Sequence, residues 1–203
     1  CFVSGNGGGI YIEKGNLVLK GNTKIFGTES KNSHTDGGGG GIYIKSGSTL
    51  TIKDLCEINN NKAMDKTNDT FTGYGGGICN LGTIIMEGGT ITENEAKEGG
   101  AVYNNGTFKM SGSAKITPST GEDEHKKGKN DVYLNNSTLI NVIGTLTASQ
   151  NQAARITVHK TKYNPSTQVL DGSTTENANK FKVTKKGSEE WEVKSDGHLK
   201  KKN

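Results

Sequence analysis

Gly39-Gly40-Gly41-Ile42-Tyr43-Ile44 decides the fold, because the chain repeats it. Residues 7–12 are identical to it, and residues 75–80, 99–104 and 129–134 are progressively more divergent copies. The first apolar residue of each copy is residue 10, 42, 78, 102 or 132, so the copies are 32, 36, 24 and 30 residues apart. Internal periods of this size are typical of solenoids, in which each repeat is one structural unit stacked on the next.

Each repeat contains three short β-like segments. The first carries the inward residues Ile10, Ile42, Ile78, Val102 and Val132. The second has alternating apolar pairs: Leu17 and Leu19, Leu50 and Ile52, Ile84 and Met86, Phe108 and Met110, Ile140 and Val142. The third is centred on Ile25, Ile58, Ile91, Ile116 and Leu146. Since side chains alternate across a strand, this pattern predicts three parallel sheets around a thin apolar interior.

Polar segments at 28–38, 62–74 and 118–128 lengthen three of the repeats, always just before the glycine-rich motif. Insertions at one place in the repeat should emerge along one edge of a solenoid. Glycine before the first strand permits a positive φ and a corner with no room for a Cβ atom. Asn61, Asn80, Asn94 and Asn104 lie near the corners, where their side chains can bond backbone groups and form ladders between coils.

Other fold classes do not fit this pattern. A sandwich needs self-contained hairpins, and the sequence has no helical periodicity to support βαβ units. We therefore predict an all-β, right-handed, single-stranded parallel β-helix of the pectin lyase-like type. It should have about five coils over residues 1–152 and a small C-terminal β cap over 153–203. Residues 194–199 within the cap resemble a hairpin turn around Asp196-Gly197.

Composition agrees with a thin, elongated core. The 203 residues include 30 glycines, 2 prolines and 30% hydrophobic residues, and the net charge is +4. The charge is uneven, because residues 1–152 carry 14 lysines against 15 acids, whereas 153–203 carry 11 Lys or Arg against 6 acids. The basic tail lacks interleaved aromatic residues, so we expect no nucleic-acid partner. No stretch approaches the roughly 20 apolar residues of a membrane-spanning helix.

The motifs then suggest a family. Gly99-Gly100-Ala101-Val102 and the Ile-x-x-Asn segments at 58–61 and 91–94 resemble repeats of the chlamydial polymorphic outer-membrane proteins. They are also similar to repeats of spirochaetal surface proteins. Isoleucine replaces the aromatic residue of the family's second motif, and we expect no autotransporter barrel within these 203 residues. The resemblance covers residues 1–150 and implies a β-helix that is extracellular or on a bacterial cell surface. Cys1 is either the end of a truncated coil or a lipidated residue, and we expect the natural protein to continue upstream.

Chemistry-bearing residues are sparse in the repeats. The outward positions of the first two strands hold no acidic pair of the kind that glycoside hydrolysis needs. The pairs His34 with Asp36 and Asp123 with His125, and the acidic run 122–124, lie in polar insertions, so we predict no catalytic residue, metal or cofactor. The outward tyrosines Tyr11, Tyr43, Tyr103 and Tyr133 are the candidate partner-binding face. Stacking that stiffens the sheet is the simpler interpretation.

The sequence thus predicts a non-catalytic surface or secreted protein that is an adhesin or structural element. Its partner would be a host or cell-surface protein, a glycan, or a second copy of the chain in a filament. The alternative is a carbohydrate-binding or carbohydrate-active protein, similar to a polysaccharide lyase or hydrolase, on the same scaffold.

Overall fold

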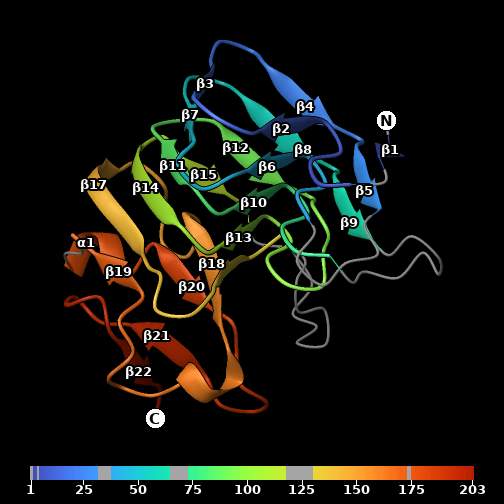
Figure 1. Ribbon diagram of the computed structural model, residues 1–203. Coiled ribbons are helices and arrows are strands. Elements are labelled where there is room, and N and C mark those ends of the chain that lie inside the picture. Colours follow the sequence, from blue (N-terminus) through green and yellow to red (C-terminus); the bar gives the residue numbers. More distant parts are fainter. Residues whose placement is uncertain (1, 4, 32–37, 65–72, 118–129, 173–174) are drawn as a thin grey trace.

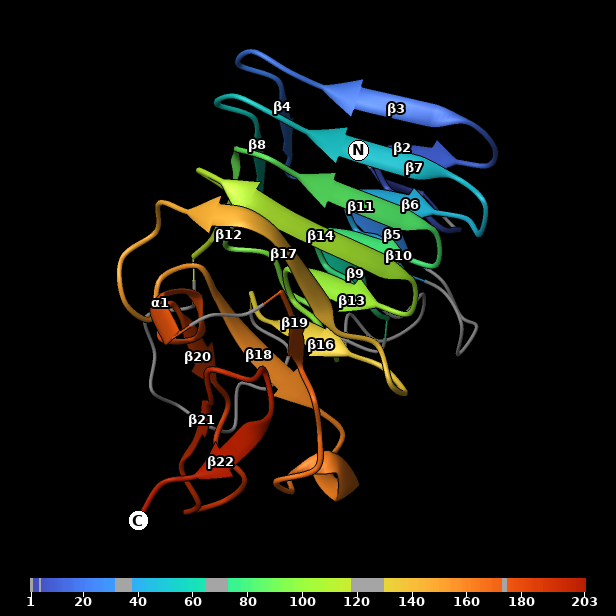
Figure 2. The ribbon, with the colours of Figure 1, turned by 90° about the vertical axis from the view of Figure 1, so that its left-hand side faces the viewer.

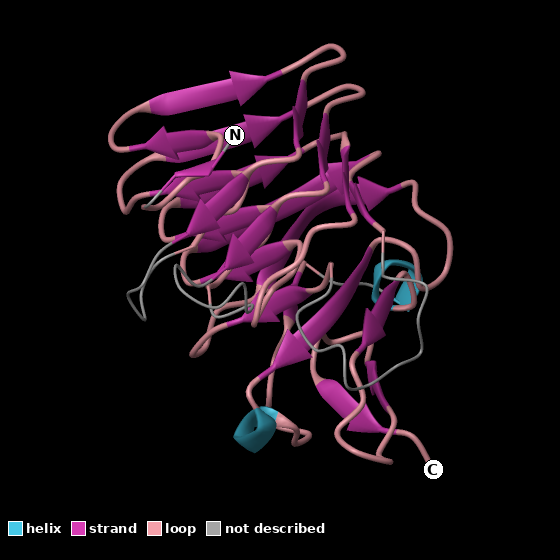
Figure 3. Cartoon of the chain, turned by 90° about the vertical axis from the view of Figure 1, so that its right-hand side faces the viewer, coloured by secondary structure: helices cyan, strands magenta, loops and turns pink. Residues whose placement is uncertain are grey.

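The computed structural model describes residues 2, 3, 5–31, 38–64, 73–117, 130–172 and 175–203. The chain forms a parallel β-helix, as the repeats predict (Figure 1). The coils stack from the first strands to a short hairpin near the C-terminus. Helices are confined to the C-terminal part of the described chain (Figure 3).

The first sheet is built from the glycine-rich motifs. Ile10, Ile42, Ile78, Val102 and Val132 lie directly opposite one another in parallel register, which confirms the alignment of the repeats. Two further strands extend this sheet beyond the five predicted repeats. Its seven strands, in spatial order, are β2 (Ile10–Ile12), β6 (Ile42–Ile44), β10 (Ile78–Asn80), β13 (Val102–Asn104), β16 (Val132–Leu134), β18 (Ala154–Val158) and β20 (Phe181–Val183).

The second sheet carries the alternating apolar pairs. Its first five strands lie side by side in Figure 2. The residues that point into the helix, such as Leu50 and Ile84, are completely buried, whereas Val18 on the outer face is half exposed. The strands are β3 (Asn16–Leu19), β7 (Thr49–Ile52), β11 (Thr83–Met86), β14 (Thr107–Gly112), β17 (Ile140–Leu146) and β19 (Leu170–Asp171).

The third sheet has one strand fewer than predicted. Its strands are β4 (Lys24–Phe26), β8 (Glu57–Asn59), β12 (Thr90–Thr92) and β15 (Lys115–Ile116). Leu146, predicted to centre the fifth, instead ends β17 and pairs with Gly112. The register between β14 and β17 shifts between Met110 and Gly112, so β17 continues through the corner where the other coils turn.

A fourth, short sheet was not predicted. It consists of β1 (Phe2–Val3), β5 (Glu29–Lys31) and β9 (Lys62–Met64). The last two strands begin the segments predicted as insertions, where polar residues concealed the extended backbone. Residues 32–37, 65–72 and 118–129, which make up most of the three predicted insertions, lie outside the described residues, as do Cys1, His34, Asp36, Asp123 and His125.

The C-terminal region first adds strands to the solenoid and then ends in a hairpin. After β18, a 3₁₀ helix (η1, Lys160–Lys162) leads through β19 to a single helical turn (α1, Thr175–Ala178) and β20. The hairpin predicted at the end of the chain is confirmed, because β21 (Trp191–Val193) pairs antiparallel with β22 (Leu199–Lys201) around Gly197. No helix in the described ranges is long and apolar enough to cross a membrane.

Asparagine ladders tie the coils together at two corners, as predicted. Asn61, Asn94 and Asn130 form one column, in which each side-chain carbonyl accepts from the amide of the coil before it. Asn80 donates to Asn104 at 2.7 Å in the other. All five side chains are buried, and those of Asn61, Asn80, Asn94 and Asn130 bond backbone groups that the turns would otherwise leave without a partner.

The two glycines that precede a first-sheet strand are required for different physical reasons, which Gly75 and Gly76 illustrate. Gly75 has a φ of 66°, a conformation that glycine adopts at low cost. A Cβ atom on Gly76 would lie 2.4 Å from the backbone oxygen of Glu95 in the next coil. The first glycine therefore makes the turn, and the second lets adjacent coils approach each other.

Candidate functional site

The four candidate tyrosines lie in one column on the first sheet. Tyr11 stacks on Tyr43 with ring centroids 5.2 Å apart, and Tyr103 stacks on Tyr133 at 5.6 Å. Tyr11 is 44% exposed, whereas Tyr43 and Tyr133 are 7% and 6% exposed. The column therefore contributes aromatic stacking along the sheet. Tyr11 presents an accessible ring, whereas Tyr43 and Tyr133 are almost completely buried.

Cys79 interrupts the column, because it lies in register between Tyr43 and Tyr103. Tyr74, from the segment before β10, compensates for the missing ring by stacking on Tyr103 at 4.7 Å. The Cys79 side chain is 1% exposed. The tyrosine column thus includes a ring that the repeat alignment did not identify.

Burial raises the pKa of the Cys79 thiol to about 12. At pH 8 only about one thiol in ten thousand would then be the reactive thiolate. We expect Cys79 to resist iodoacetamide in the folded protein and to react readily in urea, as measured by mass spectrometry of its peptide. Labelling at the same rate with and without urea would contradict the buried position.

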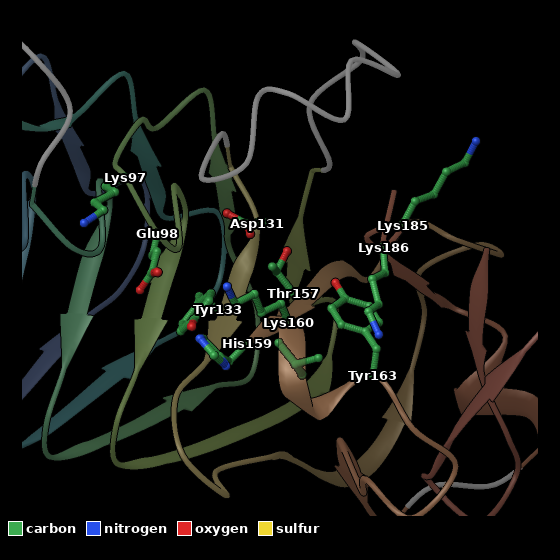
Figure 4. Close-up of a pocket in the computed structure, with 11 residues that line it drawn as sticks. Lys97, Glu98, Asp131, Tyr133, Thr157, His159, Lys160, Tyr163, Lys185 and Lys186 are labelled. Atoms are coloured by element: carbon green, nitrogen blue, oxygen red, sulfur yellow. The ribbon is translucent and has the colours of Figure 1, made fainter. Parts of the chain in front are cut away.

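A pocket of about 320 Å³ opens where the column ends (Figure 4). We call it the column-end pocket. It lies between the outer face of β16 and β18 and the segments that precede β13 and follow β20. Its lining residues are Lys97, Glu98, Asp131, Tyr133, Thr157, Val158, His159, Lys160, Tyr163, Lys185 and Lys186.

Asp131 is the most deeply buried polar residue of the pocket, at 2% exposure. Its Oδ1 accepts a 2.8 Å hydrogen bond from the Gly100 amide of the preceding coil. The Thr157 hydroxyl approaches the carboxyl, but its 2.6 Å bond is with Thr184, and Asp131 Oδ2 has no hydrogen bond of ordinary geometry. Desolvation raises the pKa of Asp131, which hydrogen bonds and Arg155 oppose. The carboxyl therefore lies behind the accessible wall of the pocket, between the Gly100 amide and the Thr157 hydroxyl.

Glu98 is the second carboxyl of the pocket and is partly exposed. Desolvation raises its pKa, and the charge of Asp131 acts in the same direction. Lys97 and His159 oppose this shift. Glu98 in turn raises the pKa of Tyr133, where burial is the larger cause and the resulting value is about 12. The carboxyls of Glu98 and Asp131 and the hydroxyl of Tyr133 therefore influence one another within the pocket.

Basic side chains surround these carboxyls. Lys97, Lys160 and Lys186 are exposed around the pocket, and Lys185 forms a 3.1 Å ion pair with Glu190. His159 begins η1, where its Nδ1 lies 2.9 Å from the Thr161 hydroxyl. Tyr163 forms an aromatic wall that is itself held by an edge contact with Trp191 at 5.8 Å. The pocket thus combines two acidic groups and aromatic walls with a positively charged rim.

The raised pKa values of Asp131 and Glu98 predict how stability varies with pH. Because both folded-state pKa values exceed the unfolded ones, the folded chain binds more protons between the unfolded and folded pKa values, and stability should fall as pH rises above about 4 through this range. The Asp131→Asn variant should show a shallower fall in urea titrations across this range. Asp196→Asn is the control, since the pKa of this exposed carboxyl is lowered to about 2. An unchanged slope in Asp131→Asn would contradict the assignment.

Sequence reasoning missed this site. Asp131 occupies the position of Gly41, Gly77 and Ala101 in the other repeats, and this divergence was the available signal. Glu98 gave no signal, because it precedes the motif and reaches the pocket only through the stacking of coils. Both carboxyls therefore enter the pocket lining from the corner of the coil and not from the outward positions of the strands.

Within the described ranges, no group of three or more His, Cys, Asp or Glu side chains is arranged to hold a metal ion. Comparison with known proteins gives no match to a family model, a curated protein or a solved structure. The site must accordingly be interpreted from its own geometry.

Proposed function

We propose that the chain is a non-catalytic β-helix element of a bacterial surface or secreted protein, and that it binds a partner on a host or cell surface. The observation that carries this proposal is the column-end pocket, which has aromatic walls and a lysine rim on a hydrogen-bonded sheet. Concave sites with apolar walls and a few fixed polar groups are typical of ligand binding. The resemblance of the glycine-rich motifs to bacterial surface repeats supports the location.

Burial of Asp131 favours binding over turnover. A carboxyl that transfers a proton must come within hydrogen-bond reach of the reacting group. Asp131 is 2% exposed and one of its oxygens is held by Gly100. In this arrangement the carboxyl is a fixed acceptor at the back of the pocket.

A carbohydrate-active enzyme is the second candidate function. It is favoured by one observation, the presence of Glu98 and Asp131 in the same pocket with raised pKa values. Glycosidases generally use two carboxyl groups, of which one has a raised pKa.

A glycan array followed by a turnover assay separates the two functions. Our proposal predicts that the folded chain retains at least one glycan or cell-surface ligand and releases it unchanged. Cleavage or elimination of a retained glycan, detected by mass spectrometry of the products, would contradict the non-catalytic proposal. Loss of that turnover in Glu98→Gln would assign the activity to the column-end pocket.

A further inference from the structure

The column-end pocket occupies the place of a missing ring. One neighbour of Tyr133 in the sheet is Tyr103, on which it stacks, and the other is Thr157. Threonine has no ring to continue the stack, and the pocket lies against both Tyr133 and Thr157. At Cys79, the earlier interruption of the column, Tyr74 compensates by stacking on Tyr103. At Thr157 a space of about 320 Å³ remains.

The walls of this space favour a ring that has both an apolar face and polar edges. Tyr133 and Tyr163 supply the aromatic surface. Sugar rings present C–H groups on their faces and hydroxyls at their edges, so they pack on aromatic rings while bonding to polar groups. The volume is near the lower end of the roughly 300–1,000 Å³ of ligand sites, which limits the occupant to a small unit.

The back of the pocket requires hydrogen-bond donors. Glu98 is a partly exposed acceptor, and Asp131 Oδ2 is a buried oxygen without a hydrogen bond of ordinary geometry. Glu98 is the acceptor that a bound molecule can reach, and a ligand hydroxyl supplies its donor, directly or through a single bridging water.

The lysines of the rim favour a ligand that carries a negative charge. Four lysines line the pocket against two carboxyls, and Lys185 is paired with Glu190. The three exposed lysines, Lys97, Lys160 and Lys186, still outnumber the carboxyls of the pocket. A neutral sugar would leave this charge without a complement, and a cationic ligand would be repelled. Lysine is an effective point-charge partner for carboxylate, sulfate or phosphate groups.

We infer that the column-end pocket binds one acidic sugar unit, which stacks on Tyr133, directs a hydroxyl toward Glu98, and places its carboxylate or sulfate among the rim lysines. This inference rests on the proposed binding function and names the chemical class of its ligand. The sugar ring extends the tyrosine column by one position.

The test is a titration of the purified chain with glucuronic acid, glucose 6-sulfate and glucose, followed by the chemical shifts of the backbone amides. We expect the amides around β16 and β18 to shift as the sugar binds. The dissociation constant should be at least tenfold lower for both acidic sugars, or for the one whose anionic group fits the rim, than for glucose. Preference for one acidic sugar distinguishes carboxylate from sulfate recognition. Equal affinity for glucose would overturn the inference.

Variants of the pocket make the assignment specific. Lys160→Ala combined with Lys186→Ala should weaken binding at least tenfold, because each removes a charge-assisted contact. The matched control replaces Lys109 and Lys115, on β14 and β15, and should leave binding unchanged. Thr157→Tyr should abolish binding by filling the space with a ring that stacks on Tyr133. If this buried substitution unfolds the chain, the lysine variants still decide the question.

The outcomes also separate this inference from the proposed function. If the chain retains array glycans but the pocket variants bind them as well as the wild type, the acidic-sugar site is wrong and the binding function stands. If acidic sugars bind in the pocket and are cleaved, the site stands and the non-catalytic function is wrong. If none of the three sugars shifts the amides around the pocket, the inference is overturned.

Discussion

Replacing Asn94 with leucine is expected to lower the free energy of unfolding by about 4 kcal/mol, since several buried polar groups lose their partners at once. Asn94 is completely buried at the centre of its ladder. Its Oδ1 accepts hydrogen bonds from the backbone nitrogen of Asn61 at 3.0 Å and from the side-chain Nδ2 of Asn61 at 2.9 Å. Its Nδ2 donates to the backbone oxygens of Ile58 and Thr92 at 2.9 and 2.8 Å. Leucine has a similar size and can make none of these bonds.

The measurement is a urea titration of Asn94→Leu beside Asn105→Leu. Asn105 is exposed and accepts long bonds of 3.3 and 3.2 Å from Asn135 and Asn136. A change of less than about 0.5 kcal/mol is expected for this control, as for most surface substitutions. Equal destabilisation of the two variants would mean that the ladder does not hold the corners.

Replacing Gly76 with alanine is expected to cost about 3 kcal/mol through steric overlap. The added Cβ atom would lie 2.4 to 2.6 Å from the oxygen, carbon and nitrogen of the Glu95 backbone. All three atoms belong to the adjacent coil, so relief requires the coils to separate. Because the sheets share these coils, the separation would weaken the hydrogen bonds between Gly76 and its neighbours as well.

The matched control is Gly144→Ala in β17. A Cβ atom at Gly144 would meet only the Cβ atom of Ser111, at an ordinary 3.5 Å. Alanine also restricts the unfolded chain more than glycine does, so this variant should be neutral or slightly stabilised. Thermal unfolding of both proteins tests the pair, and a Gly76→Ala protein as stable as Gly144→Ala would contradict the close approach of the coils.

The sequence predicts the fold where the repeat is regular. The Gly-Gly-Ile-Tyr motif positions the first sheet residue by residue, because the same side chain must be buried in every coil. Strands β5 and β9 were not predicted, since each is only three residues long and is followed by a polar stretch, although Ala63 and Met64 of β9 are buried. Strand β18 was assigned to the cap because Ala154 and Arg155 replace the glycines, although the alternation of Ile156 and Val158 matches the repeat.

The candidate site was harder to predict for a different reason. The tyrosine column follows from the period of the repeat, and Tyr133 was identified in this way. The pocket depends on what fails to continue the period, namely Thr157 in place of a tyrosine and Asp131 in place of a glycine. Its remaining residues, such as Glu98 and Tyr163, come from irregular segments whose positions are set by tertiary packing.

Parallel, in-register stacking of the coils underlies the column, the ladders and the pocket alike. It places Ile85 opposite Lys109 in adjacent strands and Thr51 on the far side of Ile85. Neighbouring strands are about 4.8 Å apart, which suits a disulfide, whereas strands two apart are separated by about 10 Å. The most direct test is oxidation of a folded variant with cysteines at positions 85 and 109, followed by mass spectrometry of its peptides. In-register stacking predicts a disulfide between these positions and none in the matched variant with cysteines at 51 and 109. Efficient cross-linking of 51 to 109, or none between 85 and 109, would contradict it.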